Sequence, residues 1–217
     1  FGDLDRIEVL KGPQGVLYGG SNIGGAVKFI STRPSPEETT GHLKFMVGEQ
    51  SSTDIEGSIN MPIGEDWAIR LFAFTREDDG FMYNPSNGDD SVAGYEESGG
   101  RLAIAGPLSD NLSLYASLRA NQFDGPNNNW AMERGTPPNF EFPYINNIET
   151  LSNNDKETFG AHLELLWELD GFDVTSISSY TDTEADRLTD VDLEPELWLN
   201  AFQNESFEAT IQEIRFA

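Results

Sequence analysis

Apolar and polar residues alternate one by one along several stretches of this chain, and that period decides which folds are open to it. Between residues 112 and 121, every second residue is Leu or Ala. Between residues 158 and 169, Phe, Ala, Leu and Trp alternate mostly with Thr, His and Glu. Because successive side chains of a strand point to opposite faces, the pattern predicts strands with one apolar and one polar face. We expect strands near residues 42–49, 53–62, 66–77, 94–106, 110–123, 156–169, 172–182 and 204–217.

The expected connections alternate between short and long. Short ones fall at 63–66, 106–111 and 169–172, and the last contains an Asp-Gly pair that suits a hairpin turn. Three long loops are expected between them, at 77–94, 124–155 and 182–204. A compact soluble domain rarely carries three structureless loops of this length. Outer-membrane barrels do have this asymmetry, with short turns at one end and longer loops at the other.

A soluble antiparallel sandwich or barrel would alternate in the same way, and composition alone favours it. Most expected strands have about ten to fourteen residues, longer than the usual mode of about five or six. Such strands suit a tilted membrane crossing. The pattern by itself leaves both a transmembrane barrel and a soluble sandwich open.

Composition excludes several classes of site. The chain has no cysteine, so it has no disulfide framework and no cysteine-based metal or nucleophile site. Its net charge of −25 repels phosphate backbones, and we expect no nucleic-acid partner. His42 and His162 both fit the polar face of a strand better than a metal site. We predict no catalytic residue, no metal and no cofactor, and therefore no enzyme.

A glycine-rich stretch at residues 10–31 interrupts the apolar pattern. It reads LKGPQGVLYGGSNIGGAVKFIS and contains six glycines, between residues that favour β-structure. Neither the P-loop spacing nor the Rossmann spacing of glycines occurs in it, so it is not a phosphate-binding loop. Prolines and small polar residues at 32–41 indicate a linker after this region.

The stretch RIEVLKGPQGVLYGGSNIGGAVKFISTRP, residues 6–34, resembles the closing segment of the plug domain of TonB-dependent outer-membrane receptors. Weaker features of that family follow in order at 79–81, 106–118 and 211–217. The plug residues that match the family motif are Arg6, Glu8, Gly12, Pro13, Gly15, Tyr18, Gly19, Gly24 and Gly25.

The resemblance implies an all-β protein, a transmembrane antiparallel up-and-down β-barrel preceded by the C-terminal part of a plug. Residues 1–34 would end the plug, and residues 41–217 would form about eight of the roughly twenty-two strands of such a barrel. The chain is then a piece of a longer receptor in the bacterial outer membrane, in contact with lipid. It would import a siderophore, vitamin or saccharide, driven by a TonB-type complex through a segment outside these residues. A soluble extracellular carbohydrate-binding module remains the alternative.

The resemblance also implies candidate site residues. Aromatic residues of the long loops could contact cargo, and the acidity of these loops would repel anionic ferric siderophores more than neutral or cationic ligands. Family members often carry a basic residue where this chain has Gly20; if it pairs with barrel carboxylates, that pair is absent here or comes from Arg6 or Lys28. The loop aromatics are Trp130, Tyr144 and Trp198, and the residues expected to face the lumen are Arg101, Arg119, Glu164, Glu213 and Arg215.

Overall fold

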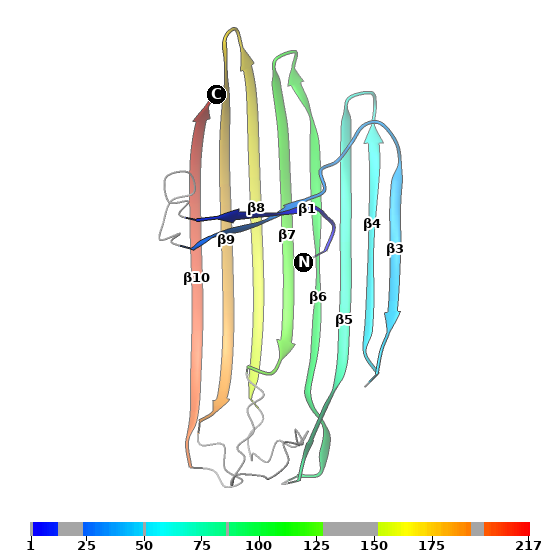
Figure 1. Ribbon diagram of the computed structural model, residues 1–217, viewed down its shortest axis with the longest axis vertical. Helices are drawn as coiled ribbons and strands as arrows, with labels where there is room; N and C mark the ends of the chain where they lie inside the picture. Colours follow the sequence, from blue (N-terminus) through cyan, green and yellow to red (C-terminus); the bar gives the residue numbers. More distant parts are fainter. Residues whose placement is uncertain (1, 13–23, 50, 86, 128–151, 192–197) are drawn as a thin grey trace.

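The computed structural model describes residues 2–12, 24–49, 51–85, 87–127, 152–191 and 198–217, and every regular element in them is a β-strand. Two strands form a small antiparallel sheet and eight form a larger one (Figure 1). The small sheet pairs β1 (Leu4–Lys11) with β2 (Gly25–Ser31). The larger sheet runs in chain order through β3 (Thr40–Val47), β4 (Thr53–Ile63), β5 (Trp67–Asn84), β6 (Asp89–Ser109), β7 (Leu112–Gly125), β8 (Asn153–Leu169), β9 (Phe172–Asp190) and β10 (Asn200–Phe216).

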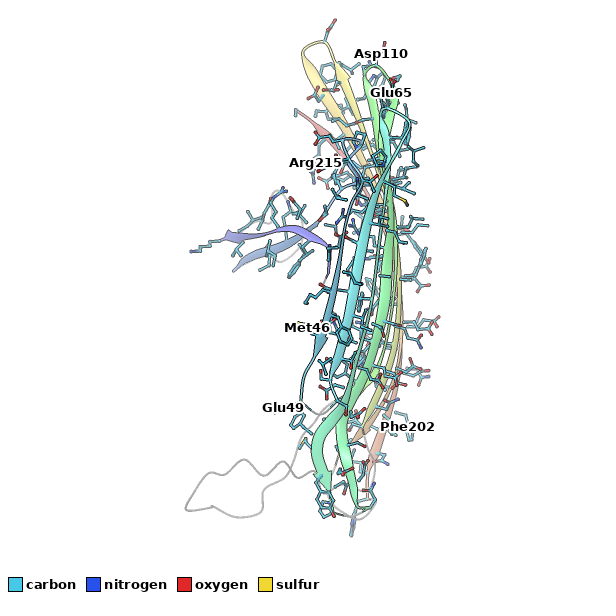
Figure 2. All side chains as sticks on the ribbon, turned by 90° about the vertical axis from the view of Figure 1, so that its right-hand side faces the viewer. Met46, Glu49, Glu65, Asp110, Phe202 and Arg215 are labelled. Atoms are coloured by element: carbon cyan, nitrogen blue, oxygen red, sulfur yellow. The ribbon has the colours of Figure 1, made fainter. Side chains whose placement is uncertain are left out.

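Three tight turns lie together at one end of the larger sheet. They join β4 to β5, β6 to β7 and β8 to β9, as the sequence predicted. Figure 2 labels Glu65 and Asp110 in two of them. Gly64 (φ +69°) and Gly171 (φ +94°) adopt the left-handed conformation that these turns need, which glycine adopts without steric cost. The eight strands follow one another in chain order, each antiparallel to the next, so the sheet is an up-and-down meander.

All eight expected strands of the larger sheet are present, but two of the expected long loops are largely strand. The region 77–94 is not a loop, because β5 continues to Asn84 and β6 begins at Asp89. The β5–β6 pairing continues there through two register shifts. Gly80 adopts φ +91°, and the carbonyl oxygens of Ser91 and Val92 lie too close to it for any residue with a Cβ. The region 182–204 is also shorter than expected, because β9 extends to Asp190. Asp and Asn weaken the strand signal in both regions, and Gly does so in 77–94, while neighbouring strands still supply ladder partners.

The register assigns each side chain of the larger sheet to one of two faces. We call the face on which β1 and β2 lie the hairpin face, and the other the opposite face (Figure 2). The rows of apolar residues from the sequence analysis lie on the opposite face and are half-buried or exposed; for example, Leu118 is 49% exposed and Leu163 38%. Within the described residues no second layer covers this face. The sheet is therefore a single layer and not half of a sandwich.

Charge is divided between the two faces. Every Lys and Arg of β3 to β10 lies on the hairpin face by register: Lys44, Arg70, Arg76, Arg101, Arg119, Lys156, Arg187 and Arg215. On the opposite face, five carboxylates are direct cross-strand partners in one row over β5 to β9: Glu77, Glu96, Asp124, Asp155 and Asp186. This row lies toward the end of the sheet away from the tight turns.

In the ranges that the structure describes, no helix reaches the length and hydropathy of a membrane-spanning segment.

Candidate functional site

The hairpin of β1 and β2 crosses the larger sheet nearly at right angles to its strands (Figure 1) and projects away from it (Figure 2). In the described residues, β1 and β2 pair only with each other. One face of the hairpin is apolar and exposed, with Ile7 opposite Phe29 and Val9 opposite Val27. Its connection to the larger sheet therefore depends on the residues at its base.

A buried carboxylate ties the start of the hairpin to the sheet. The Asp3 side chain is 1% exposed. It accepts hydrogen bonds from Arg70 Nε, at 2.9 and 3.0 Å to its two oxygens, and from Arg101. Arg70 also donates to Ser58 Oγ at 3.0 Å. Carboxylate–guanidinium pairs of this kind combine charge with directed hydrogen bonds, so one side chain joins the hairpin to β4, β5 and β6.

The residue that follows β2, Thr32, bonds to Asp3 and to Arg101 as well. Thr32 donates from its backbone nitrogen to the Asp3 carbonyl oxygen at 2.9 Å, and Arg101 donates to the Thr32 carbonyl oxygen at 2.8 Å. Beside it, Gly2 passes so close to Phe72 that a Cβ would lie 2.1 Å from the ring. Phe72 is 4% exposed, which explains why an aromatic residue shares the polar face with arginines. We call Asp3, Thr32, Arg70 and Arg101 the base clamp.

A second tie joins the linker after β2 to β8. Arg33 donates two hydrogen bonds to the Glu164 carboxylate, at 3.0 and 2.8 Å. Its guanidinium lies 4.4 Å from the centre of the Tyr115 ring, a cation–π distance. The hydrogen bonds to Glu164 raise the pKa of the Arg33 guanidinium above its ordinary value, so it stays charged.

An asparagine on β4 holds the rest of the linker. Asn60 is 2% exposed. Its side-chain amide accepts from the Ser35 backbone nitrogen at 2.9 Å and donates to the carbonyl oxygens of Ser35 and Glu38, each at 2.8 Å. Buried polar groups need such partners, and here one amide satisfies three backbone groups of an irregular segment.

The hairpin's own charges pair within the hairpin. Glu8 lies 2.8 Å from Arg6 and 3.3 Å from Lys28, and their hydrogen bonds lower the pKa of the Glu8 carboxyl. Arg6 and Lys28 thus each have an ion-pair partner on the hairpin. In the linker, Arg33 pairs with a carboxylate of the sheet, Glu164, whereas at Asp3 the carboxylate lies on the hairpin side and the arginines on the sheet.

The register places all five residues that were predicted to face a lumen on the hairpin face. Arg101 and Glu164 contact the N-terminal segment directly, as described above. Glu213 and Arg215 pair with each other at 2.5 Å on β10. Arg119 lies beside Gly160, where a Cβ would come within 2.5 Å of its Nε.

The plug-motif residues are described in part. Arg6 and Glu8 lie on β1, Gly12 takes φ +85°, and Gly25 takes φ +141° with the Leu10 carbonyl oxygen too close for a side chain. Gly24 accepts a hydrogen bond from the Gly12 nitrogen at 3.2 Å. The others, Pro13, Gly15, Tyr18 and Gly19, lie outside the described residues, as do Trp130 and Tyr144.

The remaining residues from the sequence analysis are Trp198 and the two histidines. Trp198 is 77% exposed and precedes β10. The two histidines lie on the hairpin face, each 2.9 to 3.0 Å from a serine hydroxyl: His42 with Ser58 and His162 with Ser179. Among the described residues there is no group of three or more side chains with the arrangement of a metal site.

Sequence reasoning missed Asp3, Arg33 and Asn60, which make most of the contact between hairpin and sheet. One signal was available for the partner strand. In 66–77, Arg70 and Phe72 share a face, which departs from the clean alternation elsewhere. A mixed face indicates a place where the sheet meets another part of the protein.

No family model matches the chain. In sequence it is 30% identical over 103 residues to the pesticin receptor of Yersinia pestis, covering 47% of this chain and 15% of that protein. It is 38% identical over 76 residues to the ferrioxamine receptor of Yersinia enterocolitica, covering 35% and 11%. It is 26% identical over 119 residues to the vitamin B12 transporter BtuB of Vibrio cholerae, covering 54% and 19%. The chain thus spans less than a fifth of these curated relatives.

Solved structures of outer-membrane receptors have a part that is similar in fold to this chain. The ferric yersiniabactin uptake receptor FyuA of Yersinia pestis superposes with a TM-score of 0.83 at 20% identity, over 99% of this chain and 33% of that one. The ferripyoverdine receptor of the outer membrane of Pseudomonas aeruginosa superposes with a TM-score of 0.75 at 16% identity, over 98% and 29%.

The relatives are receptors and transporters rather than enzymes, which confirms the expectation for this chain. Their location also confirms the expected one, the outer membrane of Gram-negative bacteria. The expected fold class is confirmed as well: all-β, with an antiparallel up-and-down sheet of the kind found in their barrels. By sequence and by fold, this chain is similar to a part of the TonB-dependent outer-membrane receptors.

Proposed function

We propose that the whole protein imports a scarce small-molecule nutrient across the outer membrane, with residues 1–34 ending its plug and residues 41–217 opening its barrel. Energy would come from a TonB-type complex that engages a segment outside these residues. The names of the relatives include cargoes as different as ferric siderophores and vitamin B12. We therefore keep three candidate cargo classes for this protein: siderophores, vitamins and saccharides.

One observation carries the proposal: the two faces of the sheet have opposite chemistry and different neighbours. The opposite face of β8 is apolar from Phe159 to Leu169. At ~3.4 Å per residue this band is about 34 Å long, or about 24 Å high at a tilt of ~45°. Barrels in the outer membrane carry an apolar band of about 25 Å. The hairpin face is polar and holds the N-terminal segment by buried ion pairs, as a wall would hold a plug.

The alternative, a soluble carbohydrate-binding module, requires the apolar rows to meet in a closed interior. In the described residues they do not, so no specific observation favours the module.

Two measurements on the full-length protein test the proposal. Spin labels at Leu114, Leu163 and Leu165 should be accessible to oxygen dissolved in lipid, whereas labels at Ser117 and His162 should be accessible to a water-soluble nickel complex. In cells, uptake of a panel of ferric siderophores, cobalamin and oligosaccharides should identify a cargo whose import stops without TonB or with a protonophore, while surface binding persists. Water accessibility of all five labels, or uptake that is indifferent to TonB, would contradict the proposal.

A further inference from the structure

A cleft of about 880 Å³ lies between the hairpin, the linker and the hairpin face of the sheet. It collects basic side chains from six segments, namely β1, β2, the linker, β6, β7 and β10, of an otherwise strongly acidic chain. Six of the thirteen Lys and Arg residues line it: Arg6, Lys28, Arg33, Arg101, Arg119 and Arg215.

Most of these cations have a carboxylate partner. Arg6 and Lys28 are matched by two carboxylates of the hairpin, Arg33 by Glu164 and Arg215 by Glu213. At the base clamp, Asp3 is the ion-pair partner of both Arg70 and Arg101, and Arg119 lies opposite Arg101 in the β6–β7 register. Three positive charges and one negative charge leave a local excess of +2, in a chain whose net charge is −25.

Arg119 is the cation that has no counter-ion. It is exposed, and within the described ranges no carboxylate comes within ion-pairing distance of it. It lies directly opposite Arg101 in the β6–β7 register, and like charges in that position repel each other. Gly160 gives its side chain room to lie over β8 on the floor of the cleft. Nearby, Tyr115 accepts a hydrogen bond from Arg101 at 3.3 Å, which leaves its hydroxyl hydrogen free to donate.

We propose that this cleft binds the carboxylate or phosphate group of a small ligand, with Arg119 as the main contact and Arg101 beside it. A planar guanidinium offers paired N–H donors that match the two oxygens of such a group. The bound anion would supply the negative charge that the base clamp lacks and would reduce the repulsion between the two arginines. The inference rests on the arrangement of hairpin and wall and does not require import.

Binding of inorganic phosphate and of citrate to the purified full-length receptor, measured by calorimetry at low ionic strength, tests the site. Arg119→Gln removes the charge at similar length and should weaken binding of at least one of the two anions by about tenfold or more. Arg187→Gln is the matched control. It also removes a guanidinium from the hairpin face, but one that pairs with Glu205 at 2.6 Å outside the cleft, and it should leave affinity unchanged.

A second variant separates position from charge. Gly160→Ala adds a methyl group where the Arg119 side chain lies, so it should weaken binding without changing any charge, while Arg119→Lys should retain part of it. Crystals grown with selenate should show its anomalous signal between Arg119 and Arg101. The site is refuted if the wild-type receptor binds neither anion, if Arg119→Gln binds like the wild type, or if a carboxylate from elsewhere in the full-length chain occupies Arg119. Loss of import with binding intact would count against the proposed function alone.

Discussion

The N-terminal hairpin and the eight-stranded sheet are both antiparallel, yet different interactions hold them in place. Each strand of the sheet pairs along most of its length with its neighbours, so backbone hydrogen bonds position it. The hairpin has a ladder of its own, but side chains at its base connect it to the sheet, above all Asp3 and Arg33. We therefore expect a single side-chain substitution to displace the hairpin more readily than a strand of the sheet, because few side chains hold the hairpin in place.

The largest effect is expected from Asp3→Ala. It leaves Arg70 and Arg101, each with a side chain 10% exposed, buried without their carboxylate. Breaking a buried pair from one side costs about 3–5 kcal/mol. We expect the hairpin to lose its fixed position while the sheet persists. Double electron–electron resonance between labels at Ile7 and Glu65 of the full-length protein should then show a broadened distance distribution.

Asp5→Ala is the control for that change, because Asp5 is two residues away, is 51% exposed at its side chain and, among the described residues, pairs with the exposed Arg6. The distribution should stay narrow. Equal broadening in both variants would mean that the hairpin is held by something other than the base clamp.

A slightly smaller effect is expected from a charge on the sheet face that we assign to lipid. Leu163→Arg should destabilise the protein in bilayers by about 2–4 kcal/mol, since lipid-facing arginine near the bilayer midplane costs this much in barrels. Thr158→Arg, on the same strand but on the hairpin face, should cost much less. Reversible unfolding from lipid vesicles measures both, and equal costs would remove the distinction between the two faces.

A stabilising change is expected in the row of carboxylates. Asp124 lies between Glu96 and Asp155, both direct cross-strand partners of the same charge. Asp124→Asn should raise the free energy of unfolding by about 0.5 kcal/mol, because like charges in that position repel. The gain should shrink at high salt. Asp110→Asn, in a tight turn outside the row, should change the free energy of unfolding little. A loss of stability on Asp124→Asn would show that other groups already offset the repulsion within the row.

The smallest effect is expected at Glu8. Its pKa lies below the ordinary value of 4.5, because Arg6 and Lys28 donate hydrogen bonds to it. A lowered folded-state pKa gives stability that is present at neutral pH and is lost as pH falls through that pKa. The Glu8 carboxylate remains accessible to solvent, with its side chain 32% exposed, so solvent screening leaves little of this stability. Glu8→Gln should not move the Ile7–Glu65 distance at pH 7; a shift as large as that of Asp3→Ala would place the anchor in the hairpin itself.

Local pattern was enough for the strands and tight turns of the sheet. Alternation of single residues located all eight strands, most clearly where one face is apolar, as in β7 and β8. It failed in 77–94, where Gly80 and the acidic residues around it resemble a loop. The strands continue there because each has a partner already in register, which is a property of the neighbouring strand and not of the segment.

The sequence by itself determined the alternation of faces, the ends at which turns and longer connections gather, and the family motif of the glycine-rich stretch. Only the tertiary structure decided how the hairpin is held, that Asp3 lies between two arginines about 70 and 100 positions later, and that Arg119 lies opposite Arg101 with no ion-pair partner among the described residues. The reason is physical. The period of a strand is set by bonds between adjacent residues, whereas the partner of a charge depends on which distant strands the register brings beside it.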